Sequence, residues 1–198
     1  MRIGLFFGSF NPIHQAHLII ANYILNEGLV DRIWFVVSPH NPLKESKSLL
    51  NENHRLHLVH LAIEGESRMK ASDVEFFLPR PSYTSVTLAH LTEKYPDNQF
   101  AVVLGGDSFQ NITKWKNYKY IINNYNIILY NRPGFTIDNT LGAKLNVVDA
   151  PLLELSATQI REMIRQKKSI RYFLPDNVIE EIQKGGYYRN KPCQRRRS

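Results

Sequence analysis

Two kinds of segment alternate along this chain, and the alternation limits the folds that it can adopt. Residues 2–7, 32–37 and 99–104 are short apolar runs, and residues 126–130 and 146–148 repeat the pattern. Such runs predict buried strands. Elsewhere apolar residues recur at helical spacing, which predicts helices. The first predicted helix ends before Gly28, the second and third cover about 53–64 and 83–95, the next begins at Ser156, and the last covers 176–184. In the second helix, one shared face is predicted for Leu56, Val59, His60 and Ile63.

Strands that alternate with helices favour a parallel sheet with helices on both faces. We therefore predict an α/β fold, a Rossmann-like doubly wound parallel sheet, with a small C-terminal helical subdomain. The length of 198 residues suits one such domain and not two. We expect a single domain over 1–189, of which 150–189 form the helical part, and a basic, disordered tail over 190–198.

Composition argues against membrane and disulfide-dependent proteins. No apolar run approaches the roughly 18 residues of a membrane-spanning helix, and the first run breaks at Gly8 before a signal-peptide core could form. Cys193 is the only cysteine, which excludes an internal disulfide and a cysteine-based metal site. We expect a cytoplasmic protein with no membrane partner.

The net charge of +7 would suit a nucleic-acid-binding protein if it were spread over the folded domain. Much of it instead falls in the last ten positions, which contain no acidic residue. The basic residues there are Arg189, Lys191, Arg195, Arg196 and Arg197. We expect no nucleic-acid partner and keep binding through the tail as a remote alternative. The oligomeric state stays open, a homo-oligomer included.

The segment from Gly8 to His17 follows the first predicted strand, at a position where open α/β sheets bind ligands. Its sequence is Gly-Ser-Phe-Asn-Pro-Ile-His-Gln-Ala-His. Glycine and serine allow the backbone to approach a phosphate closely, and a helix N-terminus directs N–H groups toward it. His14 and His17 are about one helical turn apart, so both imidazoles can face the same phosphate.

A second candidate for phosphate binding begins at Ser156. The order Ser-Ala-Thr-Gln predicts a capping box, with Ser156 as the N-cap and Gln159 at the third helical position. The capped end offers hydroxyl and N–H groups to a nucleotide. Arg161 shares the helix face of Thr158, where its guanidinium can bind phosphate oxygens in pairs. An amphipathic helix with a good cap is the structural alternative for this segment alone.

Other segments carry polar or aromatic residues at predicted turns and helix starts. Each alone is compatible with a structural role, such as a solvated lysine or a tryptophan that packs on a helix; their collinear order makes them informative. They are Ser38-Pro39-His40-Asn41-Pro42-Leu43-Lys44, Ser82-Tyr83-Thr84-Ser85-Val86-Thr87-Leu88, Gly105-Gly106-Asp107-Ser108 with Trp115, Arg132-Pro133-Gly134, and Leu174-Pro175 with Tyr187-Tyr188-Arg189.

In this order the segments resemble the motifs of nicotinate mononucleotide adenylyltransferases, from Arg2 to Arg189. The first loop resembles the (T/H)-x-G-H signature of the nucleotidyltransferase superfamily, and the segment from Ser156 to Arg161 resembles its S-x-T-x-x-R signature. The resemblance implies an enzyme of NAD biosynthesis that transfers AMP from ATP to nicotinate mononucleotide, giving nicotinate adenine dinucleotide and pyrophosphate. The alternatives are adenylyltransferases that act on nicotinamide mononucleotide or phosphopantetheine.

The resemblance implies that Trp115 stacks on the pyridine ring of the acceptor and that the Tyr83-Thr84 segment receives its carboxylate. The acceptor phosphate is ionised at neutral pH, so positioning and charge stabilisation can suffice without a side-chain nucleophile. The predicted catalytic residues are His14, His17, Lys44 and Arg161; the ATP-binding residues are Gly8, Ser9, Phe10, His17, Gly105, Asp107, Ser156, Thr158 and Arg161; the acceptor-binding residues are Asn11, Lys44, Tyr83, Thr84, Trp115 and Arg132.

Two positions depart from the family pattern. Asn11 replaces an aspartate, and Ala16 replaces the glycine of the H-x-G-H form. Asparagine keeps a turn-forming side chain and an amide donor, so we expect that position to function. Alanine adds one methyl group, which makes the α-phosphate pocket slightly tighter if glycine serves close approach.

The histidines at 54, 57 and 60 are the remaining metal-site candidate. Steps of three residues advance around a helix, so the third imidazole is rotated well away from the first. We therefore predict no metal site built by the protein. Mg²⁺ is expected to arrive with ATP and to bridge its phosphate oxygens.

Overall fold

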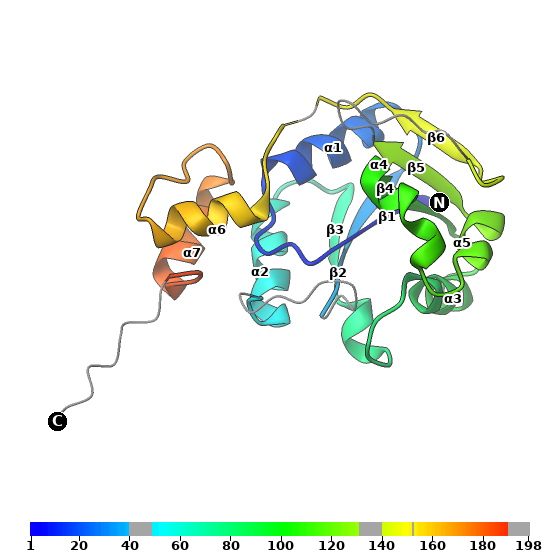
Figure 1. Cartoon of the computed structure of the whole chain (residues 1–198), viewed down its shortest axis with the longest axis horizontal. Helices are drawn as coiled ribbons and strands as arrows, with labels where there is room; N and C mark the ends of the chain where they lie inside the picture. Colours follow the sequence, from blue (N-terminus) through cyan, green and yellow to red (C-terminus); the bar gives the residue numbers. More distant parts are fainter. Residues whose placement is uncertain (40–48, 131–139, 152, 190–198) are drawn as a thin grey trace.

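The computed structural model describes residues 1–39, 49–130, 140–151 and 153–189. A six-stranded sheet forms its centre, in the order β3-β2-β1-β4-β5-β6 (Figure 1). All neighbouring strands are parallel, which confirms the predicted doubly wound sheet. The strands are β1 (Arg2–Gly8), β2 (Arg32–Val37), β3 (Met69–Ser72), β4 (Gln99–Gly105), β5 (Asn126–Tyr130) and β6 (Leu145–Val148).

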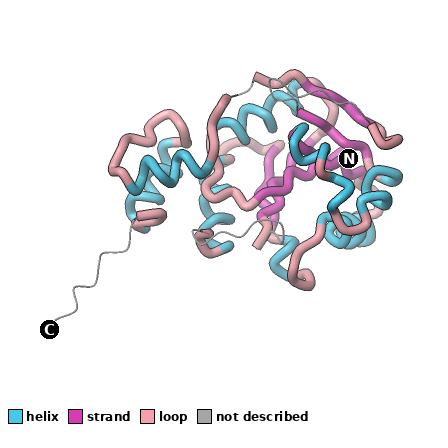
Figure 2. Tube along the Cα trace, viewed as in Figure 1, coloured by secondary structure: helices cyan, strands magenta, loops and turns pink. Residues whose placement is uncertain are grey.

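Helices connect the strands and cover both faces of the sheet (Figure 2). The described α-helices are α1 (Gln15–Asn26), α2 (Glu52–Ala62), α3 (Thr84–Lys94), α4 (Gly106–Gln110), α5 (Tyr118–Asn124), α6 (Ala157–Arg165) and α7 (Asp176–Gly185), and the short 3₁₀ helices are η1 (Val74–Phe77) and η2 (Ile112–Lys114).

Alternate residues of each strand point to opposite faces and so supply two separate cores. In β1, Ile3 and Leu5 join the core on the side of α3 and α5, whereas Phe6 joins the core on the side of α1 and α2. In β4, Val102 and Val103 divide in the same way. Burial on both faces explains why these strands are nearly continuous apolar runs.

The structure has elements that the sequence did not predict, namely β3, α4 and α5. β3 contains Lys70 and Ser72, so it lacks the apolar run by which the other strands were found. It is an edge strand that pairs only with β2, and such a position tolerates polar residues. α4 begins at a glycine and is five residues long, too short for a helical period to be visible.

The predicted buried face of α2 was partly wrong. Val59 is buried as expected, but His60 is exposed, and the buried positions also include Arg55 and Leu58. The predicted face did not include Arg55, because arginine side chains are mostly exposed in proteins. Arg55, Leu58 and Val59 have the i, i+3, i+4 spacing of one helix face.

The C-terminal helices α6 and α7 lie beside α1 and α2 (Figure 1) and share their core. Ile160 and Ile182 belong to the same buried cluster as Phe6 and Leu58. The Asn177 side-chain amide donates to the carbonyl of Leu61 at 2.6 Å. One domain over 1–189 stays a prediction, and the predicted tail, 190–198, lies outside the described residues.

Over the described part of the chain, no helix combines the length and the apolarity that crossing a membrane requires.

A core substitution in α7 tests whether the C-terminal helices unfold with the sheet. Ile182 is 2% exposed, and replacing a buried isoleucine by alanine costs about 2–5 kcal/mol. We expect Ile182→Ala to lower the free energy of unfolding by this amount within a single denaturant transition. The neighbouring exposed position supplies the control, since Gln183→Ala should change stability by less than about 0.5 kcal/mol. Two separate transitions would contradict a single domain.

Candidate functional site

A pocket of about 670 Å³ lies at the carboxyl ends of the central strands. Its lining includes Gly8 and Ser9 at the end of β1, Gly105 at the end of β4, Ser38 after β2, and Tyr130 of β5. The strand order reverses between β1 and β4, so the pocket occupies the topological switch point at which such sheets bind ligands. Its volume suits a small molecule of nucleotide size.

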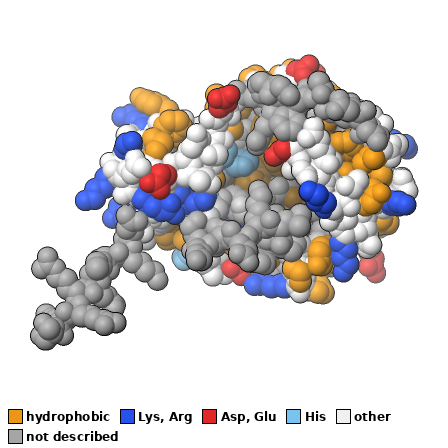
Figure 3. All heavy atoms as spheres, in the orientation of Figure 1, with side chains coloured by type: hydrophobic (Ala, Val, Ile, Leu, Met, Phe, Trp, Pro, Cys, Tyr) orange, Lys and Arg blue, Asp and Glu red, His pale blue; other side chains and the backbone are white. Residues whose placement is uncertain are grey.

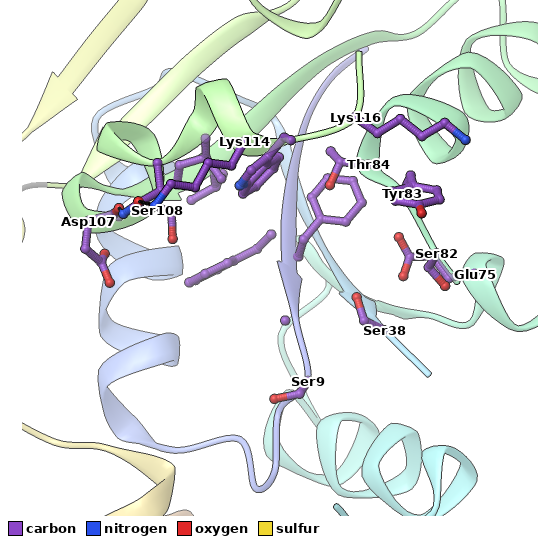
Figure 4. Close-up of a pocket in the computed structure, with 18 of the residues that line it drawn as sticks. Ser9, Ser38, Glu75, Ser82, Tyr83, Thr84, Asp107, Ser108, Lys114 and Lys116 are labelled. Carbon is purple, nitrogen blue, oxygen red and sulfur yellow. Dashed lines mark hydrogen bonds between the residues drawn. The ribbon is translucent and has the colours of Figure 1, made fainter. Parts of the chain in front are cut away.

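The two ends of the pocket differ in chemistry. Asp107 and Ser108 of α4 lie at one end, and Glu75, Ser82 and Tyr83 lie together at the other (Figure 4). Thr84 and Trp115, which the sequence assigned to the acceptor together with Tyr83, also line the pocket. The structure therefore brings the predicted acceptor residues of α3 and the segment after η2 to one cavity.

Lys116 adds a cation that the sequence prediction did not include. Its Nζ lies 4.4 Å from the centroid of the Tyr83 ring, a cation–π contact at the edge of the pocket. Lys114 lines the same cavity, and its Nζ donates to Oδ1 of Asn111 at 2.8 Å. The pair flanks Trp115 in the sequence, and this charge pattern around an aromatic residue was the available signal.

The predicted site residues fall into three groups. Gly8, Ser9, Gly105, Asp107, Tyr83, Thr84 and Trp115 line the pocket. Lys44 and Arg132 lie outside the described residues. Phe10, Asn11, His14, His17, Ser156, Thr158 and Arg161 are not among the residues that line it. The third group forms a second cluster, at the N-termini of α1 and α6.

The two histidines of the first loop lie against one another, with ring centroids 3.8 Å apart. The main-chain N–H of His14 donates to Nδ1 of His17 at 3.2 Å. An imidazole that accepts at Nδ1 is in the tautomer that carries its proton on Nε2, so the neutral His17 ring presents an N–H donor at Nε2. That both rings face one phosphate stays a prediction, and His14 is only 5% exposed.

Phe10 is 2% exposed, and its ring packs against Phe6, His17 and Phe35. Only its backbone is therefore available to a nucleotide. The ring also explains the glycine two positions earlier, because a Cβ at Gly8 would lie 2.9 Å from the Phe10 ring. Glycine lets the backbone turn beneath this ring and keeps the loop close to the pocket.

Asn11 is buried, and its Oδ1 accepts a hydrogen bond from the main-chain N–H of Leu50 at 3.1 Å. This contact fixes the loop to the start of the segment before α2. The turn-forming role that we expected for asparagine fits this arrangement. Its role in acceptor binding stays a prediction.

The helix α6 begins with the predicted capping box. Gln159 N–H donates to Oγ of Ser156 at 3.2 Å, and Ser156 N–H donates to Oε1 of Gln159 at 2.9 Å. Arg161 then joins this helix to the first loop, since Nη1 donates to the main-chain oxygen of Asn11 at 2.8 Å and Nη2 to Oγ1 of Thr158 at 3.2 Å. The two motifs, far apart in sequence, thus meet in one cluster.

Burial lowers the pKa of Arg161, and the nearby Tyr188 acts in the opposite direction. The guanidinium still carries its charge at neutral pH, since an arginine pKa starts far above it. Burial raises the pKa of Tyr188, against the influence of Arg55 and Arg161. Within the described residues the buried Tyr188 hydroxyl has no hydrogen-bond partner, so a neutral phenol stands beside two cations.

Arg55 is the principal residue that sequence reasoning missed. It is fully buried, and its guanidinium donates to four main-chain carbonyls; no carboxylate of the described residues binds it. The acceptors are the carbonyl oxygens of Leu50, Ser9, Ser38 and Pro39, of which Leu50 and Ser38 lie at 2.8 Å. Burial lowers its pKa, as expected for a cation removed from water.

Glu75 is the second missed residue. It is 2% exposed, lines the pocket, and its Oε1 accepts a hydrogen bond from the Thr87 hydroxyl at 2.9 Å. Burial raises the pKa of this carboxyl, while the hydroxyls of Ser38, Thr87 and Ser82 act to lower it. An acidic residue inside the apolar run Val-Glu-Phe-Phe was the available signal.

The described residues contain no group of three or more His, Cys, Asp or Glu side chains placed to hold a metal ion. His54, one of the three histidines of α2, instead contacts the Tyr187 hydroxyl through Nδ1 at 3.0 Å. In the space-filling view, histidine atoms are visible near the centre of this face, and Lys and Arg side chains gather over the C-terminal helices (Figure 3).

Comparison with known proteins gives one consistent family. Residues 5–163 match the model of the family described as cytidylyltransferase-like. A protein of Flavobacterium johnsoniae named "Probable nicotinate-nucleotide adenylyltransferase" is 45% identical over 96% of this chain and 100% of its own length. A protein of Cytophaga hutchinsonii with the same name is 46% identical, with the same coverage.

Solved structures agree with the fold. The Plasmodium falciparum nicotinic acid mononucleotide adenylyltransferase complexed with NaAD superposes with a TM-score of 0.80, at 22% identity over 94% of this chain and 97% of that one. A putative nicotinate-nucleotide adenylyltransferase from Vibrio parahaemolyticus gives a TM-score of 0.71, at 22% identity over 96% of each chain.

A substitution of Arg55 tests whether its guanidinium holds together the loops around Ser9 and Ser38 at the pocket. Arg55→Met would leave four carbonyls without their donor, and an unsatisfied buried polar group costs about 1–3 kcal/mol. We expect a loss of at least about 3 kcal/mol in the free energy of unfolding, measured by urea denaturation. Arg68→Met, which removes a partly exposed ion pair with Glu66, should cost less than about 1 kcal/mol. Equal losses in both variants would show that the four contacts contribute little.

Proposed function

This chain belongs to the cytidylyltransferase-like family, and we propose that it is a nicotinate-nucleotide adenylyltransferase. It transfers AMP from ATP to nicotinate mononucleotide and releases pyrophosphate, a step of NAD biosynthesis. The observation that carries the proposal is the identity of 45–46% with proteins of this name over their whole length. The pocket supports it, because Trp115, Tyr83 and Thr84 share one cavity with Gly8, Ser9 and Asp107.

The reaction needs no nucleophile from the protein. A phosphate oxygen of the acceptor attacks the α-phosphorus of ATP, the new P–O bond forms, the bond to the β-phosphate oxygen breaks, and pyrophosphate leaves with the electron pair. The protein contributes by holding the two phosphates in line and by stabilising the negative charge of the transition state.

We assign the phosphate contacts to the cluster at the N-termini of α1 and α6. His17 would donate from Nε2, since its Nδ1 already accepts from the His14 N–H. Each terminal nitrogen of Arg161 keeps a second hydrogen beyond the bonds to Asn11 and Thr158. Lys44, His14 and the first-turn N–H groups of α6 complete the proposed set, together with the hydroxyls of Ser156 and Thr158.

The acceptor end would hold the pyridine ring. We assign stacking to Trp115, which supplies dispersion and cation–π attraction to a ring with a positive nitrogen. The main-chain N–H groups near Tyr83 and Thr84, at the N-terminal end of α3, would receive the carboxylate. Asn11 and Arg132 remain proposed contacts of the rest of the acceptor.

Mg²⁺ is proposed to enter with ATP as part of the substrate. It prefers octahedral oxygen ligands, keeps several waters, and commonly binds nucleotide phosphates with few protein ligands. The absence of a metal-binding cluster among the described residues is compatible with that mode. We also propose a cytoplasmic location, where ATP and a reduced Cys193 are expected.

A histidine substitution tests the phosphate cluster. His17→Ala removes the proposed Nε2 donor, and losing one donor to a transition-state oxyanion lowers turnover by about a hundredfold or more. We expect this fall in kcat for pyrophosphate release from ATP, measured with a panel of acceptors: nicotinate mononucleotide, nicotinamide mononucleotide and phosphopantetheine. His57→Ala, at an exposed position of α2, is the matched control and should retain full turnover. Near-normal turnover of His17→Ala would remove His17 from the mechanism.

Acceptor choice is the second test. A site that offers N–H donors to a carboxylate opposes the NH₂ of an amide, and such a mismatch is costly when buried. We expect kcat/KM to favour nicotinate over nicotinamide mononucleotide by at least about tenfold, equivalent to about 1.4 kcal/mol. Trp115→Ala should weaken both acceptors and preserve their ratio, because stacking does not distinguish acid from amide. Equal kcat/KM for the two acceptors in the unmodified enzyme would defeat the assignment.

A further inference from the structure

A group of buried polar side chains lies behind the proposed carboxylate subsite. Glu75, Ser82 and Tyr83 lie together at one end of the pocket (Figure 4), and Glu75 is 2% exposed. Among the described residues, Oε2 of Glu75 and the hydroxyls of Ser82 and Ser85 are buried without a well-formed hydrogen bond. Phosphate transfer, as proposed above, uses none of them.

The contacts of the Thr87 hydroxyl with Glu75 and Tyr83 are compatible with a neutral Glu75. The Thr87 oxygen lies 2.9 Å from Oε1 of Glu75 and 3.3 Å from the main-chain oxygen of Tyr83. A hydroxyl has one hydrogen, so it cannot donate well to both oxygens. Both contacts become good hydrogen bonds if Glu75 is a neutral acid that donates to Thr87, while Thr87 donates to Tyr83.

Two further observations agree with a neutral Glu75. An ionised carboxylate with one buried, unpartnered oxygen is costly, whereas the carbonyl oxygen of a neutral acid is tolerated better. Burial also raises the pKa of Glu75, and this is the largest influence on it. The chain of hydrogen bonds from Glu75 through Thr87 ends at Tyr83, the N-cap residue of α3.

The charged and titratable groups around Glu75 come from several elements. On its own segment Asp73 is exposed, and from α3 Tyr83 faces the pocket. Lys116 lies over the Tyr83 ring, and Lys114 and Asp107 line the pocket further away. From α2, Arg55 binds the carbonyl of Ser38, whose hydroxyl is near Glu75.

We propose that Glu75 is a positioning residue that sets acceptor preference through its charge. As a neutral acid it anchors the N-terminal end of α3 and leaves no negative charge beside the subsite for the acceptor's carboxylate. As an anion it repels that carboxylate and reverses the direction of its bond to Thr87. The inference rests on the proposed function and names the determinant of selectivity in that same site.

The predicted consequence is a preference for acid over amide that depends on pH. The neutral form of Glu75 predominates at low pH, so the ratio of kcat/KM for nicotinate to nicotinamide mononucleotide is largest there. The ratio falls as pH rises through the pKa of Glu75. Titration of ATP, of the acceptor phosphate and of shared enzyme groups cancels, because the two acceptors differ only in the exocyclic group.

The experiment measures this ratio for the unmodified enzyme between about pH 5.5 and pH 9. A unit charge introduced beside another in a partly buried site changes binding by about tenfold or more, so we expect a fall of at least that size. Glu75→Gln keeps an amide donor near Thr87 and cannot ionise. Its ratio should stay constant at the high value that the unmodified enzyme shows at low pH.

Two control variants separate Glu75 from its neighbours. Asp73→Asn removes an exposed carboxylate two residues away, and Lys116→Met removes the cation over Tyr83. Both should still show a ratio that falls with pH. A ratio that does not vary with pH in the unmodified enzyme would overturn the inference, and so would a titration that survives in Glu75→Gln.

Thermal unfolding gives a readout that does not depend on the acceptor. A carboxyl whose pKa is raised by folding contributes stability at low pH and loses it as pH rises through the folded pKa. The Tm of Glu75→Gln should therefore increase relative to the unmodified enzyme as pH rises, and a constant difference would count against a neutral Glu75. Absence of turnover with both acceptors would overturn the proposed function, and the inference about acceptor preference with it.

Discussion

A buried guanidinium holds together the part of the molecule that faces its ligands. Arg55 contacts the carbonyls of Ser9 after β1, Ser38 and Pro39 after β2, and Leu50 before α2. These are segments whose backbone groups cannot be satisfied by the sheet, and which would otherwise be buried unpaired. A planar donor with several N–H groups satisfies them together, which no lysine could do in this geometry. The shape of the pocket mouth therefore depends on one side chain of α2.

The charged side chains of the site are distributed differently at its two ends. Cations lie where phosphates are proposed to bind, with Arg161 between the first loop and α6. At the other end the only nearby acid, among the residues that line the pocket there, is Glu75, which burial disfavours as an anion. Lys116 lies over the ring of Tyr83 and lines the same pocket. Such an arrangement suits two anionic substrates, because a neutral Glu75 does not repel the acceptor electrostatically.

The fold was largely predictable because its strands are buried on both faces and hence visible as apolar runs. The order of the motifs along the chain identified Trp115 and Tyr83, which line the pocket. Each motif alone would also have fitted a structural role. Arg55 and Glu75 were missed for a common physical reason: each is a charged residue type whose burial depends on partners distant in the sequence. The contact of Arg161 with Asn11 was likewise invisible, because spacing within a helix carries no information about a loop 150 residues away.

That last contact has a consequence for the order in which the chain acquires its structure during synthesis. The first loop emerges from the ribosome early, but the Arg161 that fixes it, and the Phe173 carbonyl that accepts from Gln15 N–H at 3.0 Å, emerge only much later. β1 also waits for β4, its neighbour on one side. Domains of this kind fold as units once their partners are present. A nascent chain without its last quarter therefore carries both histidines and all six strands, and it keeps the contacts of the first loop with Arg55 and Leu50, but it lacks the contacts that join this loop to Arg161 and Phe173.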